Sequence, residues 1–257
     1  MSTKSPLKAR RNNSRSRIEK ILQIFRHPSS EKEKMIRIAL EFDHGINFSK
    51  RYPRAVTGFG GVLLDSDTSA YQEAYNLGYF LVDELGYSVA TGGGPGIMEA
   101  LNKGAYDAKG NSLGICIKLP QYNQRELQNE YLTDSISCKY FFTRKFFLSA
   151  IGEILFFFAG GDGTMDEYYE MITLVQTGKF DPPPPIILVD DDKEFWKIRL
   201  RQDRDLMLRR YHTIEKKDLQ IPHRVHGAEG AKRYIRRLIR EYNLVPPKPL
   251  SEQKAVQ

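Results

Sequence analysis

A glycine-rich turn, Gly160-Gly161-Asp162-Gly163-Thr164, lies between an apolar segment and a segment with the apolar spacing of a helix. Glycines in such a turn let backbone N–H groups approach a ligand closely. The first turn of the following helix adds unpaired N–H groups and a partial positive charge, so an anion such as phosphate is favoured. The hydroxyl of Thr164 can add one more donor. The turn therefore predicts a phosphate-binding loop; a tight strand-to-helix turn without a ligand is the alternative.

A second turn, Gly92-Gly93-Gly94-Pro95-Gly96, has the same character. Two such turns after neighbouring strands favour ligand binding over two empty turns. The spacing of these glycines differs from the G-x-G-x-x-G fingerprint of dinucleotide-binding proteins, and neither turn is followed by the Gly-Lys-Ser/Thr of a Walker A loop. NAD binding and ATP hydrolysis therefore lack their usual sequence support.

Two charged side chains near the first turn are candidates for chemistry. Glu167 lies three residues after Thr164, and one interpretation is a capping box in which Thr164 is the N-cap. In the other interpretation, the Glu167 carboxylate is held beside the phosphate and is directed at a substrate sugar; the motif supports the two equally. Arg144 and Lys145 precede the apolar segment, and the Arg144 guanidinium can form a planar contact with a carboxylate or a phosphate. A basic pair on a helix is more often solvated, which is the alternative for this pair.

Metal ligands are not evident in the sequence. The five histidines are scattered outside the glycine turns, without the spacing of a metal site or of a Ser–His–Asp arrangement. The two cysteines, Cys116 and Cys138, indicate neither a disulfide framework nor a zinc site. We therefore expect no metal and no redox or other cofactor.

Alternating strands and helices must position the turns. Apolar runs predict strands at Ala55–Gly60, Tyr87–Thr91, Ser112–Leu119, Ile154–Phe158 and Ile186–Val189. Amphipathic spacing predicts helices at Ser69–Leu85, Ile97–Asp107, Arg144–Ala150, Thr164–Thr177, Phe195–Arg210 and Gly230–Tyr242. Single helices between strands imply right-handed crossovers, and hence an α/β fold with a Rossmann-like, doubly wound parallel sheet and helices on both faces. Ligands of such sheets bind outside the carboxyl ends of the strands, where Gly60 and the two turns would meet.

The charge of the chain is concentrated at its N-terminus. Residues 1–26 hold eight basic residues and one acidic residue, a difference that equals the formal net charge of +7 of the whole chain of 257 residues. We expect residues 1–17 to form a basic disordered tail, 18–50 an N-terminal helical extension, 51–245 the nucleotide-binding α/β domain and 246–257 a C-terminal tail. A weak contact of the basic tail with nucleic acid is the alternative to a solvated tail; nucleic acid is otherwise not expected as a partner.

The chain shows no stretch that approaches the length of a membrane span and no apolar segment of a secretory signal. We therefore expect a cytoplasmic protein without a membrane partner.

The two turns together resemble the signatures of the Lonely Guy (LOG) family, formerly labelled lysine decarboxylases. One family signature is a GGG loop that ends in Met, which stands here as Gly92 to Met98. The other is P-G-G-x-G-T-x-x-E, which stands here as Ala159 to Glu167. The pair Arg144-Lys145 lies at the family's spacing before the second loop, and the resemblance covers about Arg54 to Trp196.

The resemblance implies hydrolysis of a purine nucleoside 5′-monophosphate, AMP or a cytokinin ribotide, to free base and ribose 5-phosphate. It implies a homodimer or a higher homo-oligomer, and it makes Arg144 and Glu167 the catalytic pair. The residues expected to bind the substrate are Gly60, Gly92, Gly93, Gly94, Met98, Lys145, Gly160, Gly161, Gly163 and Thr164.

Two departures from the family pattern stand beside these matches: Ala159 replaces the family proline, and Gly61 stands where the family often has serine. The main alternative function is a non-catalytic carrier or sensor of a nucleotide or cofactor on the same fold. The intact pair of Arg144 and Glu167 favours the enzyme. An amino-acid decarboxylase is the weaker alternative, because no lysine lies in a recognisable pyridoxal-phosphate context.

Overall fold

The computed structural model describes residues 31–119, 127–241 and 246–247 of the chain. The chain divides into two compact units after Phe42. The described part of the first unit is residues 31–42, the beginning of helix α2 (Glu31–Arg51). The second unit begins at Asp43 and contains the sheet and the remaining described elements. The tail expected over residues 1–17 lies outside the described residues, as does most of the tail expected after residue 245.

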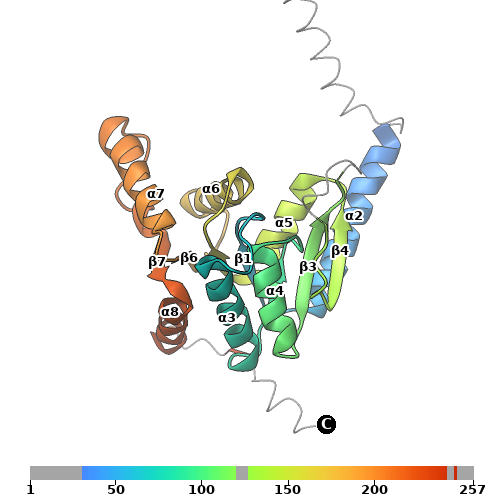
Figure 1. Ribbon diagram of the computed structural model, residues 1–257. Helices are drawn as coiled ribbons and strands as arrows, with labels where there is room; N and C mark the ends of the chain where they lie inside the picture. Colours follow the sequence, from blue (N-terminus) through green and yellow to red (C-terminus); the bar gives the residue numbers. More distant parts are fainter. Residues whose placement is uncertain (1–30, 120–126, 242–245, 248–257) are drawn as a thin grey trace, which may run out of the picture. The chain divides into compact units, whose positions relative to one another are not determined.

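Seven parallel strands form the sheet of the second unit, in the order β4-β3-β2-β1-β5-β6-β7 (Figure 1). Their bounds are β1 Ala55–Phe59, β2 Ser88–Thr91, β3 Ser112–Ile117, β4 Asp134–Cys138, β5 Gly152–Phe157, β6 Ile186–Asp190 and β7 Pro222–His226. The chain runs from β1 outward to β4 and then returns to the other side of β1 with β5. This reversal defines a doubly wound α/β sheet, so the expected fold class is confirmed. It also places the topological switch point between β1 and β5.

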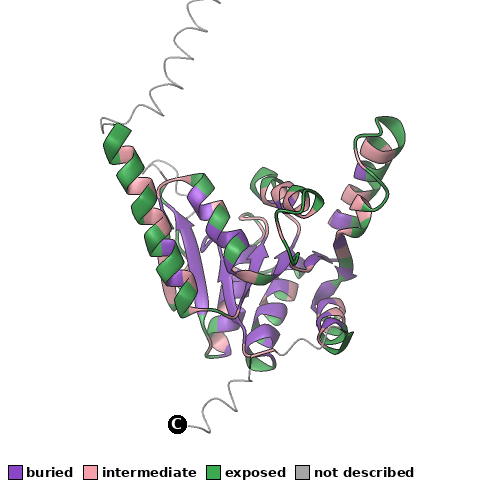
Figure 2. Ribbon diagram, turned by 180° about the vertical axis from the view of Figure 1, so that it is seen from behind, coloured by how far each residue is buried: buried purple, intermediate pink, exposed green. Residues whose placement is uncertain are grey.

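Helices cover both faces of this sheet. Their bounds are α3 Ser69–Asp83, α4 Ile97–Asp107, α5 Phe141–Ile151, α6 Asp162–Gln176, α7 Phe195–Asp203 and α8 Gly227–Glu241. In β5, Phe156 belongs to the core shared with α3, α4 and α8, whereas Phe157 packs against Tyr168 of α6 and Trp196 of α7. Because successive side chains of a strand point to opposite faces, both faces are buried. Figure 2 shows the strands as a buried layer and much of α6 and α7 as half-buried or exposed.

Two strands, β4 and β7, were missed by the sequence analysis, and both are outer strands of the sheet. The residues of β4 are mostly half-buried, and β7 carries Pro222, His223, Arg224 and His226 among its five residues. Among the described residues, each outer strand pairs with a neighbour on one side only, so it tolerates polar residues and a proline. These strands therefore lack the continuous apolar run by which the inner strands were recognised.

The start of α6 overturns the capping-box interpretation. The helix begins at Asp162 with Gly161 as its N-cap, a residue that has no side chain to accept a capping hydrogen bond. Thr164 is the third residue of the helix, so its assignment as the N-cap is wrong. Strand β5 ends at Phe157, and the extended Gly161 is the last residue before the helix, so Thr164 already lies in the first turn of α6. The helix expected over Phe195–Arg210 also differs, since α7 ends at Asp203 and continues as a π-helix over Arg204–Arg210.

Within the described ranges, no helix combines the length and the apolar character that crossing a membrane requires.

Candidate functional site

Three glycine-containing loops meet at the carboxyl edge of the sheet, beside the switch point. The N–H of Gly61, after β1, donates to the carbonyl of Ala159, after β5, at 2.9 Å. The carbonyl of Gly61 accepts from the N–H of Ile97, which opens α4 after the β2 loop, at 3.1 Å. The β1 loop is therefore bonded to both of the others, and the convergence expected from a parallel sheet is present.

The β2 loop is buried and closely packed. Gly93 and Gly96 have φ angles of +73° and +72°, which side-chain-bearing residues rarely adopt. The amide group of Asn129 donates to the carbonyl of Gly94 at 3.0 Å, and its backbone N–H donates to the carbonyl of Gly93 at 2.9 Å. The hydroxyl of Thr91 accepts from the N–H of Gly93 at 2.9 Å. This set of hydrogen bonds fixes the loop in one conformation.

Arg144 reaches this loop from the first turns of α5. Its side chain is buried, with 6% of the residue exposed. Its Nε donates to the carbonyl of Ile115 at 3.0 Å, and its Nη2 donates to the carbonyl of Gly92 at 3.4 Å. A Cβ at Gly92 would fall on the Arg144 guanidinium and lie 2.8 Å from the sulfur of Met98. Two of the predicted site residues thus contact the GGG loop, and the interpretation of Arg144 as a solvated surface residue does not hold.

The β5 loop is open by comparison. Gly160 lies against the hydroxyl of Thr164, which is 5% exposed, and a Cβ there would be 3.0 Å from the N–H nitrogen of Gly61. At Gly161 and Gly163 an added Cβ would meet nothing within 4 Å, apart from the chain neighbours and the backbone of the helix itself. An α-helix leaves its first N–H groups without partners inside the helix. The loop therefore presents backbone donors next to free space.

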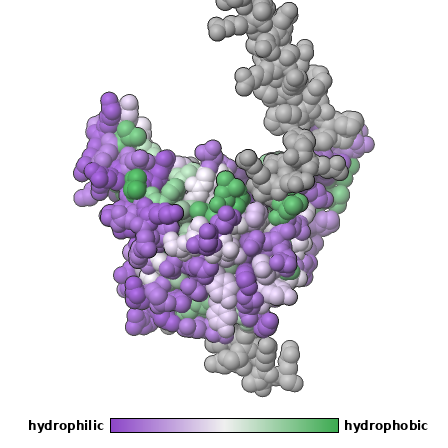
Figure 3. All heavy atoms as spheres, viewed as in Figure 1, coloured by the Kyte–Doolittle hydropathy of each residue, from purple (hydrophilic) through white to green (hydrophobic). Residues whose placement is uncertain are grey.

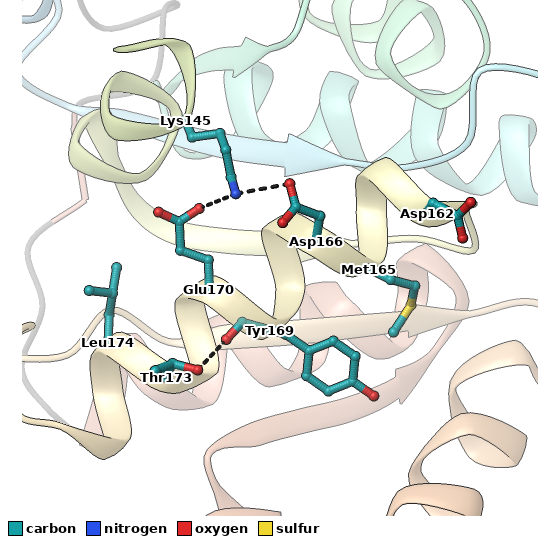
Figure 4. Close-up of a pocket in the computed structure, with 8 residues that line it drawn as sticks. All are labelled: Lys145, Asp162, Met165, Asp166, Tyr169, Glu170, Thr173 and Leu174. Atoms are coloured by element: carbon teal, nitrogen blue, oxygen red, sulfur yellow. Dashed lines mark hydrogen bonds and ion pairs between the residues drawn. The ribbon is translucent and has the colours of Figure 1, made fainter. Parts of the chain in front are cut away.

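Lys145 links the helix that carries Arg144 to the helix that carries Glu167. Its Nζ lies 2.9 Å from Asp166 and 2.7 Å from Glu170, both on α6 (Figure 4). Burial acts to lower the pKa of Lys145, but the two carboxylates outweigh it and raise the pKa above its ordinary value. Lys145 was predicted to bind substrate; the structure places it in an ion-pair triad between α5 and α6, and a contact with substrate stays a prediction.

Glu167 lies on the half-buried side of α6. It follows the buried Thr164 by three residues and precedes the buried Met171 by four, spacings that place residues on one helix face. The neighbouring Asp166 and Glu170 turn toward α5, where they contact Lys145. The structure therefore brings the two helices of the predicted catalytic pair together, and the role of Glu167 stays a prediction.

A cavity of about 400 Å³ opens from the β5 loop toward α7. Gly160, Gly161 and Asp162 form one side of it, and Met165, Phe195 and Ile198 form an apolar side. Its polar lining residues include Asp191, Lys193, Arg199 and Gln202. The lining residues beyond the loop belong to no motif in the sequence and were not predicted as site residues. Three consecutive aspartates at the end of β6 were the available signal, because polar residues at the carboxyl end of a parallel strand commonly face the ligand crevice.

One wall of this cavity is held by a polar network. The Arg199 Nη2 donates to the Tyr169 hydroxyl at 2.7 Å, and that hydroxyl donates to the Asp203 carboxylate at 2.9 Å. Burial raises the pKa of both Tyr169 and Asp203, with the Arg199 charge acting against it. Asn129 and this network are site residues that sequence reasoning missed, since neither belongs to a local motif. Across the described residues, no three metal-ligating side chains gather in one place.

The sequence profile of the family described as "Possible lysine decarboxylase" matches residues 98–235, more than half of the chain. No curated protein matches the chain at a significant level.

Solved structures resemble this chain at low sequence identity. The molybdenum cofactor binding protein of Rippkaea orientalis is 20% identical, with a TM-score of 0.51; the match covers 72% of this chain and 95% of that one. A structural-genomics target is 22% identical, with a TM-score of 0.51 and coverage of 72% and 99%. The molybdenum cofactor carrier protein of Chlamydomonas reinhardtii is 19% identical, with a TM-score of 0.49 and coverage of 72% and 98%. At these identities the likeness shows the fold, while the profile shows the family: the chain belongs to the possible lysine decarboxylase family, the LOG family that its two glycine loops resemble.

Proposed function

We propose that the protein hydrolyses the N-glycosidic bond of a purine nucleoside 5′-monophosphate, such as AMP or a cytokinin ribotide, and releases the free base and ribose 5-phosphate. One observation carries this proposal: Arg144 is buried against the GGG loop, on a helix joined through Lys145 to the helix that carries the phosphate loop and Glu167. The guanidinium of an arginine in this position matches a carboxylate or a phosphate in planar, charge-assisted contacts, the groups that a catalytic glutamate and a nucleotide bring.

In the proposed reaction, the phosphate binds at the open β5 loop. The N–H groups at the start of α6 and the Thr164 hydroxyl donate to its oxygens, and the helix dipole favours its charge. Free space at Gly161 and Gly163 is what allows this close approach. Because the phosphate is remote from the bond that breaks, its binding energy serves to hold the ribose against the catalytic groups.

Cleavage of the bond between ribose and base places positive charge on the sugar, as in glycoside hydrolysis. The Glu167 carboxylate stabilises that charge or accepts the proton of the attacking water. The positive charge of Arg144 attracts that carboxylate and orients it toward the sugar. The water adds its hydroxyl to the sugar carbon, and the base leaves with the bonding electrons and takes up a proton.

A non-catalytic carrier is the second candidate. The similar structure from Rippkaea orientalis is a molybdenum cofactor binding protein, and the same loops and adjoining cavity would serve binding alone. Turnover separates the two functions, because a carrier would bind its ligand and release it unchanged.

The test is incubation of the full chain with AMP and with isopentenyladenosine monophosphate, with free base measured by chromatography. We expect base release that falls by about 10²–10⁴-fold in Glu167→Gln, the range that a general base contributes. Glu229→Gln is the matched control: it makes the same change on α8, away from the glycine loops, where the ion-pair partner of Glu229 among the described residues is Lys232, at 2.7 Å.

Three outcomes decide the matter. Base release that depends on Glu167 but not on Glu229 supports the hydrolase. Release that survives Glu167→Gln contradicts the catalytic assignment. Binding of nucleotides without any base release, across a panel of purine and pyrimidine monophosphates, favours the carrier.

A further inference from the structure

A basic hollow of about 380 Å³ lies between the outer strand β7 and helix α8. Its charged and aromatic lining residues are His223, His226, Arg233, Tyr234, Arg237 and Arg240. It shares no lining residue with the cavity beside Gly160. In Figure 3, the surface over the position that α8 occupies in Figure 1 is hydrophilic. We refer to this feature as the β7–α8 hollow.

The cationic side chains of helix α8 lie on two of its faces. Lys232 and Arg236 pair with carboxylates, the first with Glu229 at 2.7 Å and the second with Glu84 at 2.6 Å. The three arginines of the hollow follow the spacing i, i+4, i+7, which places them together on a different face of the helix.

The charges on the hollow side of α8 are weakly neutralised. Arg233 and Arg240 have no ion-pair partner among the described residues. Arg237 pairs with Glu241 at 3.7 Å, but both side chains are about half exposed. The attraction between two exposed charges is weak in water, so this pair neutralises Arg237 only slightly. Positive charge is therefore concentrated on this face, although the chain beyond residue 26 has equal numbers of basic and acidic residues.

Two stacked aromatic rings of the hollow hold one of its arginines, Arg237, in place. His223 stacks on Tyr234 with ring centroids 3.7 Å apart, and the Arg237 guanidinium lies over the Tyr234 ring at 4.8 Å. Burial, and after it the Arg237 charge, lowers the pKa of His223 below its ordinary value. Because the Tyr234 ring is already occupied, it offers no platform on which a nucleobase could stack.

We propose that the β7–α8 hollow binds a diphosphate group, either as free pyrophosphate or as the diphosphate end of a nucleotide. Guanidinium groups match phosphate oxygens in planar, bidentate contacts. The run from Arg233 to Arg240 extends for about 10 Å along the helix, which is long for one phosphate and suits two linked phosphates. The volume lies at the small end of the range for small-molecule sites, about 300–1,000 Å³.

A nucleic-acid backbone fits the hollow less well. Such a partner needs a basic stripe that continues across the surface. Here a carboxylate stands at one end, since Asp192 lies 3.4 Å from the imidazole of His226. The hollow is thus a short basic site with an acidic residue at one end. It would recognise the phosphate groups of its ligand rather than a nucleobase.

The test is a calorimetric titration of the full chain with inorganic pyrophosphate. We expect Arg233→Ala/Arg237→Ala to weaken pyrophosphate binding by about tenfold or more, since two charge-assisted contacts are lost. Lys232→Ala/Arg236→Ala is the matched control: it removes two cations from the same helix, but from the face that pairs with Glu84 and Glu229, and its affinity should stay within about threefold. ADP should bind as pyrophosphate does, and adenosine should not bind.

Thermal melting of each variant verifies folding, and Arg240→Ala, at the exposed end of the helix, provides a milder variant with a smaller loss in the same direction. Saturating AMP should leave pyrophosphate binding unchanged, because the proposed nucleotide site is elsewhere. Equal affinity in the first double variant and the wild type would overturn the proposal. Displacement of pyrophosphate by AMP would also overturn it, as would an affinity for inorganic phosphate equal to that for pyrophosphate. A third contrary result is a single-stranded oligonucleotide that binds more tightly than pyrophosphate and loses its binding in Arg233→Ala/Arg237→Ala.

Discussion

The two glycine loops look alike in the sequence, yet their glycines meet different surroundings. In the β2 loop, Gly93 and Gly96 have positive φ angles, and a Cβ at Gly92 would collide with the Arg144 guanidinium. In the β5 loop, a Cβ at Gly161 or Gly163 would lie in open space. The first set of glycines is needed by the fold, whereas the second set is not.

This difference shows which glycines are evidence for a bound ligand. Where neighbouring atoms already exclude a side chain, as at Gly92 and Gly96, glycine is explained without any bound molecule. Where the fold leaves room, as at Gly161 and Gly163, the absence of a side chain keeps space and backbone donors accessible. The β2 loop is thus a support for Arg144, and the β5 loop is the part that argues for phosphate binding.

Gly96→Ala should have the largest effect, and it acts on stability. The new Cβ would collide with the carbonyl oxygen of Gly61, and the φ angle of +72° is strained for alanine. We expect the free energy of unfolding, measured by urea denaturation, to fall by about 2–4 kcal/mol. Gly178→Ala is the control, because Gly178 has a similar φ of +67° but open space around it, so it should lose only about 1 kcal/mol. Equal losses would mean that backbone conformation, not the contact with the β1 loop, makes glycine necessary at Gly96.

Gly92→Ala should have the next largest effect, and it acts on activity. The obstructing atom is the end of the Arg144 side chain, which can move away from its hydrogen bonds to Gly92 and Ile115. A displacement of about 1 Å at a catalytic group can cost about 10²-fold in rate, so we expect kcat for AMP hydrolysis to fall to that extent. The loss of stability should be smaller than for Gly96→Ala.

Gly110→Ala serves as the control for this variant, since its Cβ would crowd the side chain of Val82, on helix α3. It should lower stability and leave kcat unchanged. A stable Gly92→Ala protein with normal kcat would remove Arg144 from the proposed catalytic pair.

Much of the fold could be predicted because its inner strands are apolar on both faces. Ile154–Phe158 stands out in the sequence for this reason, and the helix at Ile97–Asp107 was placed at the bounds that the structure has. The parallel sheet then required the glycine loops to meet at one edge, as they do. The outer strands β4 and β7 could not be recognised, because one-sided pairing imposes no apolar run on them.

The site was predicted less completely, for a different physical reason. Local motifs reveal the loop glycines, but contacts between distant elements leave no local pattern. Lys145 meets Asp166 and Glu170 only because α5 and α6 pack together, and Asn129 reaches the GGG loop across the sheet edge. The capping-box interpretation was wrong because the spacing of Thr164 and Glu167 does not fix where the helix begins. The same residues stand in the sequence whether the N-cap is Thr164 or, as in the structure, Gly161.

Gly163→Ala should have the smallest effect, and it tests the comparison of the two loops most directly. Because its Cβ meets no neighbouring side chain and alanine favours helix, the free energy of unfolding should stay equal or rise by up to about 1 kcal/mol. The methyl group would occupy the space assigned to the phosphate, so we expect KM for AMP to rise by about threefold to tenfold while kcat changes little. Steady-state kinetics and urea denaturation on the same preparation measure both quantities. An unchanged KM in a fully stable variant would show that the open space holds no phosphate; the β5 loop would then be, like the β2 loop, a turn that serves the fold, and the phosphate-binding argument would lose its support.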